Sequence, residues 1–360
     1  MSDQGAGLER LLRRHRDALV AESGTVIREH QVLVPDRDLP QAESLLRRWS
    51  AGHEPGPGVT RVRLNARARV DVCELTLLAR DQGLGLGPNH LVHGQPLWWT
   101  GPADRPRPAP RRDLPAPGPV RREVTVAVLD TGLDPHPWYE TAGWFADQRE
   151  EVGEILDADR DLALDAQSGH GTFIAGVVLQ HAPAARIRAG RVLGGDGVAD
   201  ELDVVRALAG LSADVVNLSL GCHTFDDRPS PVLRQAVGAL GRATVVTACA
   251  GNTASDRPFW PAALEQVIGV AALDGDERAW FSNHGPWVDA CAPGVGIVSS
   301  FVRFGDFAGY ATWSGTSFAA PVVAGAIAAK AAEGMTNAEA AVQVMSSGPT
   351  RPGLGTIIRI

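Results

Sequence analysis

The sequence is poor in cysteine, lysine, tyrosine and methionine, and it contains no long apolar run. Its 360 residues include four Cys, and Lys330 is the only lysine among 34 basic residues. The cysteines form no C-x-x-C pair, and their density is far below that of a disulfide-stabilised scaffold. We therefore exclude a cysteine metal site of common spacing and a disulfide-rich secreted fold, and we expect free buried thiols in a reducing compartment.

Apolar stretches stay shorter than the roughly 20 residues that span a bilayer. The N-terminal segment MSDQGAGLERLLRRHRDALV carries scattered charges and lacks the apolar core of a signal peptide. The sequence therefore predicts no membrane association and a cytoplasmic location. A net charge of −8 also argues against a nucleic-acid partner.

The charge is unevenly distributed along the chain. Residues 1–122 contain 19 Arg and 14 acidic residues, a net charge of +5, whereas residues 123–360 carry a net charge of −13. Opposite charges favour docking of the two parts on each other, although salt screens exposed charges beyond about 10 Å.

A segment rich in proline and arginine divides the chain. Residues 100–122 hold seven prolines without an apolar pattern, which predicts an exposed, semi-rigid linker. Residues 1–99 alternate strand and amphipathic-helix patterns and predict a small α+β domain. The expected strands are residues 28–36, 58–65 and 86–94, and the expected helices are residues 39–50 and 68–83.

The pattern changes in residues 123–360, where short valine-rich runs alternate with helical patterns. Continuous apolar strands of this kind predict a parallel sheet covered by helices on both faces. Ligands bind beyond the carboxyl ends of such strands. The expected strands are residues 123–132, 185–194, 213–221, 243–252 and 266–274, and the expected helices include residues 200–211 and 230–241.

Three polar residues at such ends supply the parts of a hydrolytic site. Asp130 ends the run VAVLD, His170 lies between two glycines before an apolar helical run, and Ser317 precedes the run FAAPVVAGAI. Each has a simpler interpretation: a capping Asp, a structural His and a helix N-cap Ser. Together, however, they provide a nucleophile, a base and the carboxylate that orients the base.

A fourth residue completes the set. Asn252 follows another apolar strand, and its amide, with the backbone N–H of Ser317, can stabilise the oxyanion that acyl transfer generates. Four such residues at strand ends and helix starts favour a catalytic site over four separate structural roles.

These motifs resemble those of the subtilisin-like serine proteases, the subtilase family. The resemblance runs from about Arg122 to the C-terminus and rests on VAVLDTGLD, GHGTFIAG, NLSLG, AGN and SGTSFAAPVVAG. It implies an α/β fold, a three-layer sandwich around a mostly parallel sheet, preceded here by the small α+β domain. It also implies a triad of Asp130, His170 and Ser317, with Asn252 in the oxyanion hole.

The resemblance further implies that substrate binds as an added strand. The implied substrate-binding residues are Gly197, Val198, Ala199, Ser219, Leu220, Gly221, Ala250 and Gly251. Cys222 and Cys249 then fall near the wall of the specificity pocket, where we favour small buried fillers and leave a disulfide open.

Some positions depart from the commonest family form. Phe318 replaces a usual Met, Phe173 and Val322 replace common His residues, and His136-Pro137-Trp138 lacks an Asp that helps to bind calcium. We therefore expect no metal and no cofactor. The acid-rich residues 147–165 are expected to form a solvated surface loop, because they lack the regular carboxylate spacing and turn glycine of a calcium loop.

An acidic cluster lies beside the expected substrate strand. We favour a solvated helix start, where acids suit the dipole, over a preference for basic substrates. The cluster consists of Asp196, Asp200, Glu201 and Asp203.

Residues 1–99 resemble, in element order, the inhibitory propeptides that precede subtilase domains. Such a domain would dock on the catalytic domain, and the pairs Arg111-Arg112 and Arg121-Arg122 offer processing sites. The alternative is a permanent accessory domain. The sequence thus favours a serine endopeptidase that acts on peptide or protein substrates, in limited processing of intracellular chains. The alternative is a catalytically silent peptide-binding protein with this fold.

Overall fold

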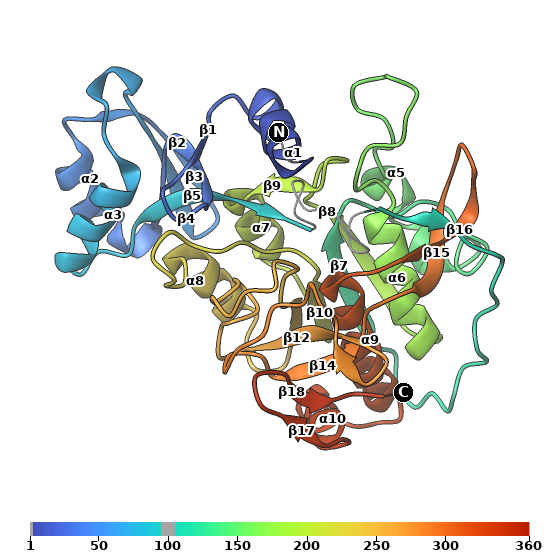
Figure 1. Cartoon of the computed structure of the whole chain (residues 1–360). Helices are drawn as coiled ribbons and strands as arrows, with labels where there is room; N and C mark the ends of the chain where they lie inside the picture. Colours follow the sequence, from blue (N-terminus) through green and yellow to red (C-terminus); the bar gives the residue numbers. More distant parts are fainter. Residues whose placement is uncertain (1–2, 95–104, 360) are drawn as a thin grey trace.

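The computed structural model describes residues 3–94 and 105–359. Within these ranges, no helix has the length and apolar character needed to cross a membrane. Figure 1 shows an N-terminal sheet lying beside a larger body, with β5 (Gly87–His93) extending from the first toward the second.

The N-terminal unit is an antiparallel sheet covered by α2 (Leu39–Leu46) and α3 (Val72–Asp81). Asp71 caps α3 by accepting from the backbone N–H groups of Cys73 and Glu74. The strands run in the order β3-β4-β2-β5, and β1 pairs with β2. Their bounds are β1 Ala18–Val20, β2 Val26–Pro35, β3 Ser50–Gly56 and β4 Val59–Leu64; α1 spans Asp3–Arg14.

The expected strands and helices of this unit are present, with shifted ends. The helix expected at residues 39–50 ends at Leu46, and the chain enters β3, an exposed strand without apolar alternation that the sequence analysis missed. The helix α1 was missed as well.

The larger body is a three-layer α/β sandwich, as predicted from the sequence. Among the described residues, nine strands form its sheet, with a path of β17-β18-β14-β12-β11-β10-β7-β8 and β13 paired with β12. The strands from β8 to β18 along this path pair in parallel, and β13 and β17 are antiparallel. The bounds are β7 Thr125–Asp130, β8 Arg186–Arg191, β10 Val215–Leu218, β11 Val245–Cys249, β12 Val267–Asp274, β13 Glu277–Arg278, β14 Ala290–Pro293, β17 Thr350–Arg351 and β18 Gly355–Ile357.

The two faces of β7 show why its residues from Val126 to Leu129 are all apolar. Val126 and Val128 pack in one core with α6 and α9, whereas Ala127 and Leu129 pack in the other with α7 and α8. A strand buried on both faces needs apolar side chains at successive positions. The helices are α6 His170–His181, α7 Glu201–Leu208, α8 Pro231–Ala239 and α9 Thr316–Ala332, with α4 Gly143–Ala146, α5 Arg149–Val152 and α10 Asn337–Met345 at the periphery.

The N-terminal unit shares a core with this body. Leu33, Val59 and Val92 lie in the same apolar cluster as residues of α7 and α8. In addition, β5 pairs with β9 (Val198–Asp200) of the body, so the N-terminal sheet continues into the second unit.

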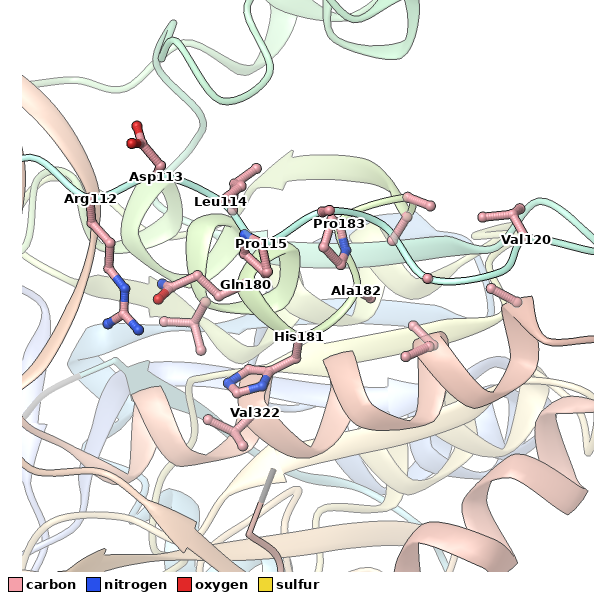
Figure 2. Close-up of a pocket in the computed structure, with 18 of the residues that line it drawn as sticks. Arg112, Asp113, Leu114, Pro115, Val120, Gln180, His181, Ala182, Pro183 and Val322 are labelled. Atoms are coloured by element: carbon pink, nitrogen blue, oxygen red, sulfur yellow. The ribbon is translucent and has the colours of Figure 1, made fainter.

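The described part of the linker runs extended over the body. Its short strand β6 (Arg107–Pro108) pairs with β16 (Phe307–Trp313), which forms a hairpin with β15 (Ile297–Phe304). Figure 2 shows the chain from Arg112 to Val120 passing over the end of α6, with a cavity of about 760 Å³ beneath it.

Arg122, at the end of the linker, is firmly held. Its guanidinium donates to Asp214 Oδ1 (2.8 Å) and to the carbonyl oxygens of Ala331 (3.0 Å) and Met335 (3.2 Å). This environment argues against Arg121-Arg122 as a processing site, because the arginine would have to leave all three acceptors.

Candidate active site

Asp130 and His170 form a buried pair. Asp130 ends β7 and His170 begins α6, and the two are 1% and 0% exposed. The His170 Nδ1 lies 2.7 Å from Asp130 Oδ1. A carboxylate on Nδ1 places the imidazole proton there and leaves a lone pair on Nε2, the form that a general base requires.

The start of α6 approaches the turn after Asp130 closely. The backbone N–H of Gly171 donates to Thr131 Oγ1 (2.9 Å), and the N–H of Thr131 donates to Asp130 Oδ1 (2.8 Å). A Cβ at Gly171 would lie 2.3 Å from the carbonyl oxygen of Gly132. Glycine at this position therefore allows the contact that brings His170 to Asp130.

An aromatic wall encloses the His170 ring. Trp313 and Phe318 each lie 5.3 Å from it, centroid to centroid, and Phe173 packs against Phe318 at 4.5 Å with its ring tilted by 55°. Phe173 and Phe318, which differ from the commonest family residues, thus form one apolar layer behind the His170 ring. Trp313, from β16, was not singled out from the sequence.

Ser317 is the second residue of α9 and is fully buried. Its Oγ donates to the carbonyl oxygen of Gly94 (3.1 Å) and lies 3.4 Å from that of Ser219. The His170 Nε2 has no hydrogen-bond partner among the described residues. The Ser317 hydroxyl therefore points toward the backbone of Gly94, a residue of the N-terminal unit.

Asn252 follows β11 and lies beside the start of α9. Its Oδ1 accepts from the backbone N–H (2.8 Å) and the hydroxyl (2.9 Å) of Thr316. Fixing Oδ1 in this way orients the amide, so its NH₂ end is turned away from Thr316. The side chain is 2% exposed, which keeps this donor in a low-dielectric site.

Residues of β5 pair with the segments that were expected to bind substrate. Val92 and His93 of β5 pair antiparallel with Ala199 and Val198. The N–H of Gly94 donates to the carbonyl oxygen of Gly197 at 3.1 Å.

The other expected substrate-binding segment, which ends at Gly221, also pairs with this strand. His93 and Gly221 exchange two backbone hydrogen bonds of 3.0 Å each. Of the remaining expected residues, Ser219 donates its hydroxyl to the carbonyl oxygen of Ser317 (2.7 Å), and Leu220 is buried in the core beside it. Residues 91–94 therefore lie between both segments as an added strand.

Ala250 and Gly251 are held by a residue that the sequence analysis missed. Asn283 donates its amide to the carbonyl oxygen of Ala250 (2.8 Å), and its backbone N–H donates to that of Gly251 (3.0 Å). Phe259 lies beside them, 5.8 Å from the His93 ring. No short motif marks Asn283, because its role depends on tertiary proximity alone.

The cysteines are free thiols. Cys222, Cys249 and Cys291 are buried, as expected, whereas Cys73 is partly exposed. Burial raises the pKa of Cys249 to about 12, although the Ser317 and Thr316 hydroxyls oppose the shift. A thiol with this pKa stays protonated and is a weak nucleophile.

The acidic cluster has a different role from either expectation. Three of its members contact the N-terminal unit: Asp196 lies 2.9 Å from His15 Nε2, Arg28 donates through Nε to Asp200 (2.8 Å), and Glu201 lies 2.6 Å from His90 Nδ1. The side chain of Asp203 is exposed on α7, and the charges of Arg61 and Arg28 of the N-terminal unit act on it. The cluster is thus part of the contact between the two units.

The acid-rich segment, residues 147–165, differs from the expected solvated loop: it contains helix α5, Asp165 is buried, and three of its aspartates are regularly spaced. Asp157, Asp159 and Asp161 alternate along the chain, and their carboxylate oxygens lie within 4.8 Å of one another. The expectation of irregular spacing was wrong, whereas Asp159 and Asp161 are exposed as expected of a solvated loop. Exposed acidic groups of this kind are common without an ion, and the absence of a metal stays a prediction.

Comparison with known proteins identifies the family. The subtilase family model matches residues 121–350. The chain belongs to the subtilase family. It is 38% identical over 251 residues to the thermophilic serine proteinase of Bacillus sp. (strain AK1), an alignment that covers 65% of this chain and 58% of that protein.

Two further subtilases are similar over more of their own length. Subtilisin BL of Lederbergia lenta is 36% identical over 219 residues, covering 57% of this chain and 75% of its own. Thermitase of Thermoactinomyces vulgaris is 32% identical over 247 residues, covering 64% and 83%. This subtilase thus spans a little over half of the first relative and most of the other two.

Proposed function

We propose that this subtilase is a serine endopeptidase. The observation that carries the proposal is the buried Asp130–His170 pair, joined at 2.7 Å through Nδ1, beside Ser317 and a strand-like chain in the cleft. Ser317 Oγ bonds to the substrate carbonyl carbon while His170 Nε2 takes its proton. The same proton then passes to the leaving amine, and water repeats the sequence to release the acyl group.

Asn252 and the start of α9 would stabilise the oxyanion. The positive end of this 17-residue helix lies at Ser317, and the Asn252 amide is oriented by Thr316. Cleavage-site profiling of a peptide library by the wild type and by Ser317→Ala tests the activity. Cleavage by the wild type alone supports the proposal. Equal cleavage by both, or no cleavage by wild type whose N-terminal unit has left the cleft, contradicts it.

The N-terminal unit acts, in this proposal, as an inhibitory domain. Its residues 91–94 occupy the cleft, and the Gly94 carbonyl oxygen lies 3.1 Å from Ser317 Oγ. A Cβ at Gly94 would meet the His170 ring at 3.2 Å, so the strand covers the catalytic base. Substrate cannot enter until this segment leaves.

Intact mass separates a cleaved propeptide from a permanent accessory domain. Loss of the N-terminal unit in the wild type but not in Ser317→Ala indicates self-processing, and the contact with Ser317 favours a new terminus next to Gly94 over Arg111-Arg112. A full-length mass in active protein indicates retention. The intracellular processing role and the cytoplasmic location stay predictions.

The second candidate is a catalytically silent peptide-binding protein. The filled cleft favours it, and so does His170 Nε2, which lacks a hydrogen-bond partner within the part of the chain that the structure describes. A phosphonate probe that fails to label Ser317 even after the N-terminal unit is removed would support this candidate.

A further inference from the structure

Glu154 lies in the loop after α5, and its carboxylate binds the first turn of α6. Its Oε2 accepts from the backbone N–H of Gly169 (3.1 Å), and its Oε1 accepts from the N–H (3.1 Å) and hydroxyl (3.0 Å) of Thr172. The helix has no side-chain cap of its own, because Gly169 is its N-cap residue. Glu154 therefore satisfies donors on either side of His170.

The same residue is joined to the segment that carries Asp130. The backbone N–H of Glu154 donates to Asp134 Oδ1 (3.3 Å), and the N–H of Asp134 donates to the Thr172 hydroxyl (2.9 Å). Glu154 thus connects the turn after Asp130 to the start of α6 without a hydrogen bond to the His170 ring.

We propose that ionised Glu154 is a positioning residue that holds the first turn of α6 so that the His170 ring stays aligned with Asp130. The N–H groups of Gly169 and Thr172 and the hydroxyls of Thr172 and Thr131 converge on its carboxylate. A protonated carboxyl would add a hydrogen atom among these donors. Protonation therefore weakens the hold on α6. The inference rests on the proposed protease function, since alignment affects turnover only if His170 is the base.

The environment of Glu154 brings this protonation close to neutral pH. Burial raises the pKa of Glu154 to about 7, although the N–H groups of Gly169 and Thr172 lower it, and the charge of Asp130 raises it further. An ordinary glutamate is already ionised well below neutral pH. The charge of Asp130 acts on Glu154, and Glu154 in turn acts on Tyr139. Asp134 accepts from the Glu154 N–H and is itself near Arg149, and Arg191 donates to the adjacent carbonyl oxygen of Gly153.

Kinetics across about pH 5 to 9 test the role. Protein purified from the full chain is compared with Glu154→Gln, with Glu154→Asp, which keeps the charge, and with Glu151→Gln on the exposed face of α5 as control. We expect Glu154→Gln to lower kcat roughly ten- to hundredfold with little change in KM. The acid limb of the kcat–pH profile should follow one ionisation in Glu154→Gln. It should follow two ionisations in the wild type and in Glu154→Asp.

A second measurement does not need activity. In full-chain Ser317→Ala, the NMR signal of the His170 Nδ1 proton should shift in two steps with pH, and Glu154→Gln should remove the step near pH 7. An unchanged kcat in Glu154→Gln, or a second step that persists in it, overturns the inference. A wild type that stays inactive after its N-terminal unit has left the cleft refutes the proposed function instead, and the NMR titration still tests Glu154.

Discussion

Arg28 offers a direct test of how the N-terminal unit closes the cleft. It lies on β2, and its guanidinium contacts Asp200 at 2.8 Å through Nε and 2.6 Å through Nη2. Both side chains are 12% exposed. Replacing Arg28 with Ala changes no residue of the larger body. A gain in activity must therefore come from weaker docking or from a less stable N-terminal unit, because Arg28 also contacts Asp17 and His15.

The magnitude follows from the burial of the pair. Removing one partner of a buried, hydrogen-bonded charge pair costs about 2 to 5 kcal/mol. In Arg28→Ala, Asp200 still has the Asn89 amide at 3.2 Å and the Arg61 guanidinium at 3.9 Å. We therefore expect a cost at the low end of this range. About 2 kcal/mol corresponds to a roughly 30-fold larger open fraction.

The assay is the initial rate of peptide hydrolysis by the full-length chain, with mass spectrometry to verify its length. Arg28→Ala should hydrolyse the peptide roughly 30 times faster than the wild type. Arg67→Ala is the control, because Arg67 is exposed on the same unit, away from the body. Equal initial rates for the wild type and Arg28→Ala would refute the reasoning.

Three further changes probe the site and its support. Asn252→Ala should lower kcat about 100- to 1000-fold in peptide hydrolysis, and an unchanged kcat removes Asn252 from the oxyanion hole. Gly171→Ala places a Cβ 2.3 Å from a carbonyl oxygen and should lower the unfolding free energy by about 2 kcal/mol in chemical denaturation, whereas Gly52→Ala meets no atom within 4 Å and should be neutral. Burial raises the pKa of both thiols, to about 11 for Cys73 and about 12 for Cys249, so their exposure decides the order of modification. Iodoacetamide at about pH 8 should therefore modify partly exposed Cys73 before buried Cys249, and rapid modification of Cys249 would contradict its enclosure.

The sequence predicted the sheet and its polar ends because both depend on local patterns. Runs such as that ending at Asp130 are apolar on both faces, and His170 and Ser317 each open an apolar helix. Short motifs therefore mark these positions without knowledge of the fold. The structure adds the distance between Asp130 and His170 and the aromatic wall behind the ring.

Residues whose role depends on distant contacts could not be found in this way. Glu154 and Asn283 act through backbone groups of other segments, and no local spacing marks them. Likewise β3 is an exposed strand without apolar alternation. The contacts of Asp200 depend on the pairing of β5 with β9, which no local pattern predicts. The charge asymmetry indicated docking but gave no register.

The central claim is that Ser317 is an active nucleophile paired with His170. A fluorophosphonate probe, applied to Arg28→Ala protein and followed by peptide mapping, tests it most directly. The account predicts label on the peptide that contains Ser317, and none in the Ser317→Ala or His170→Ala variants of that protein. Absence of label on Ser317 in protein whose N-terminal unit has been shown to leave the cleft would contradict the account.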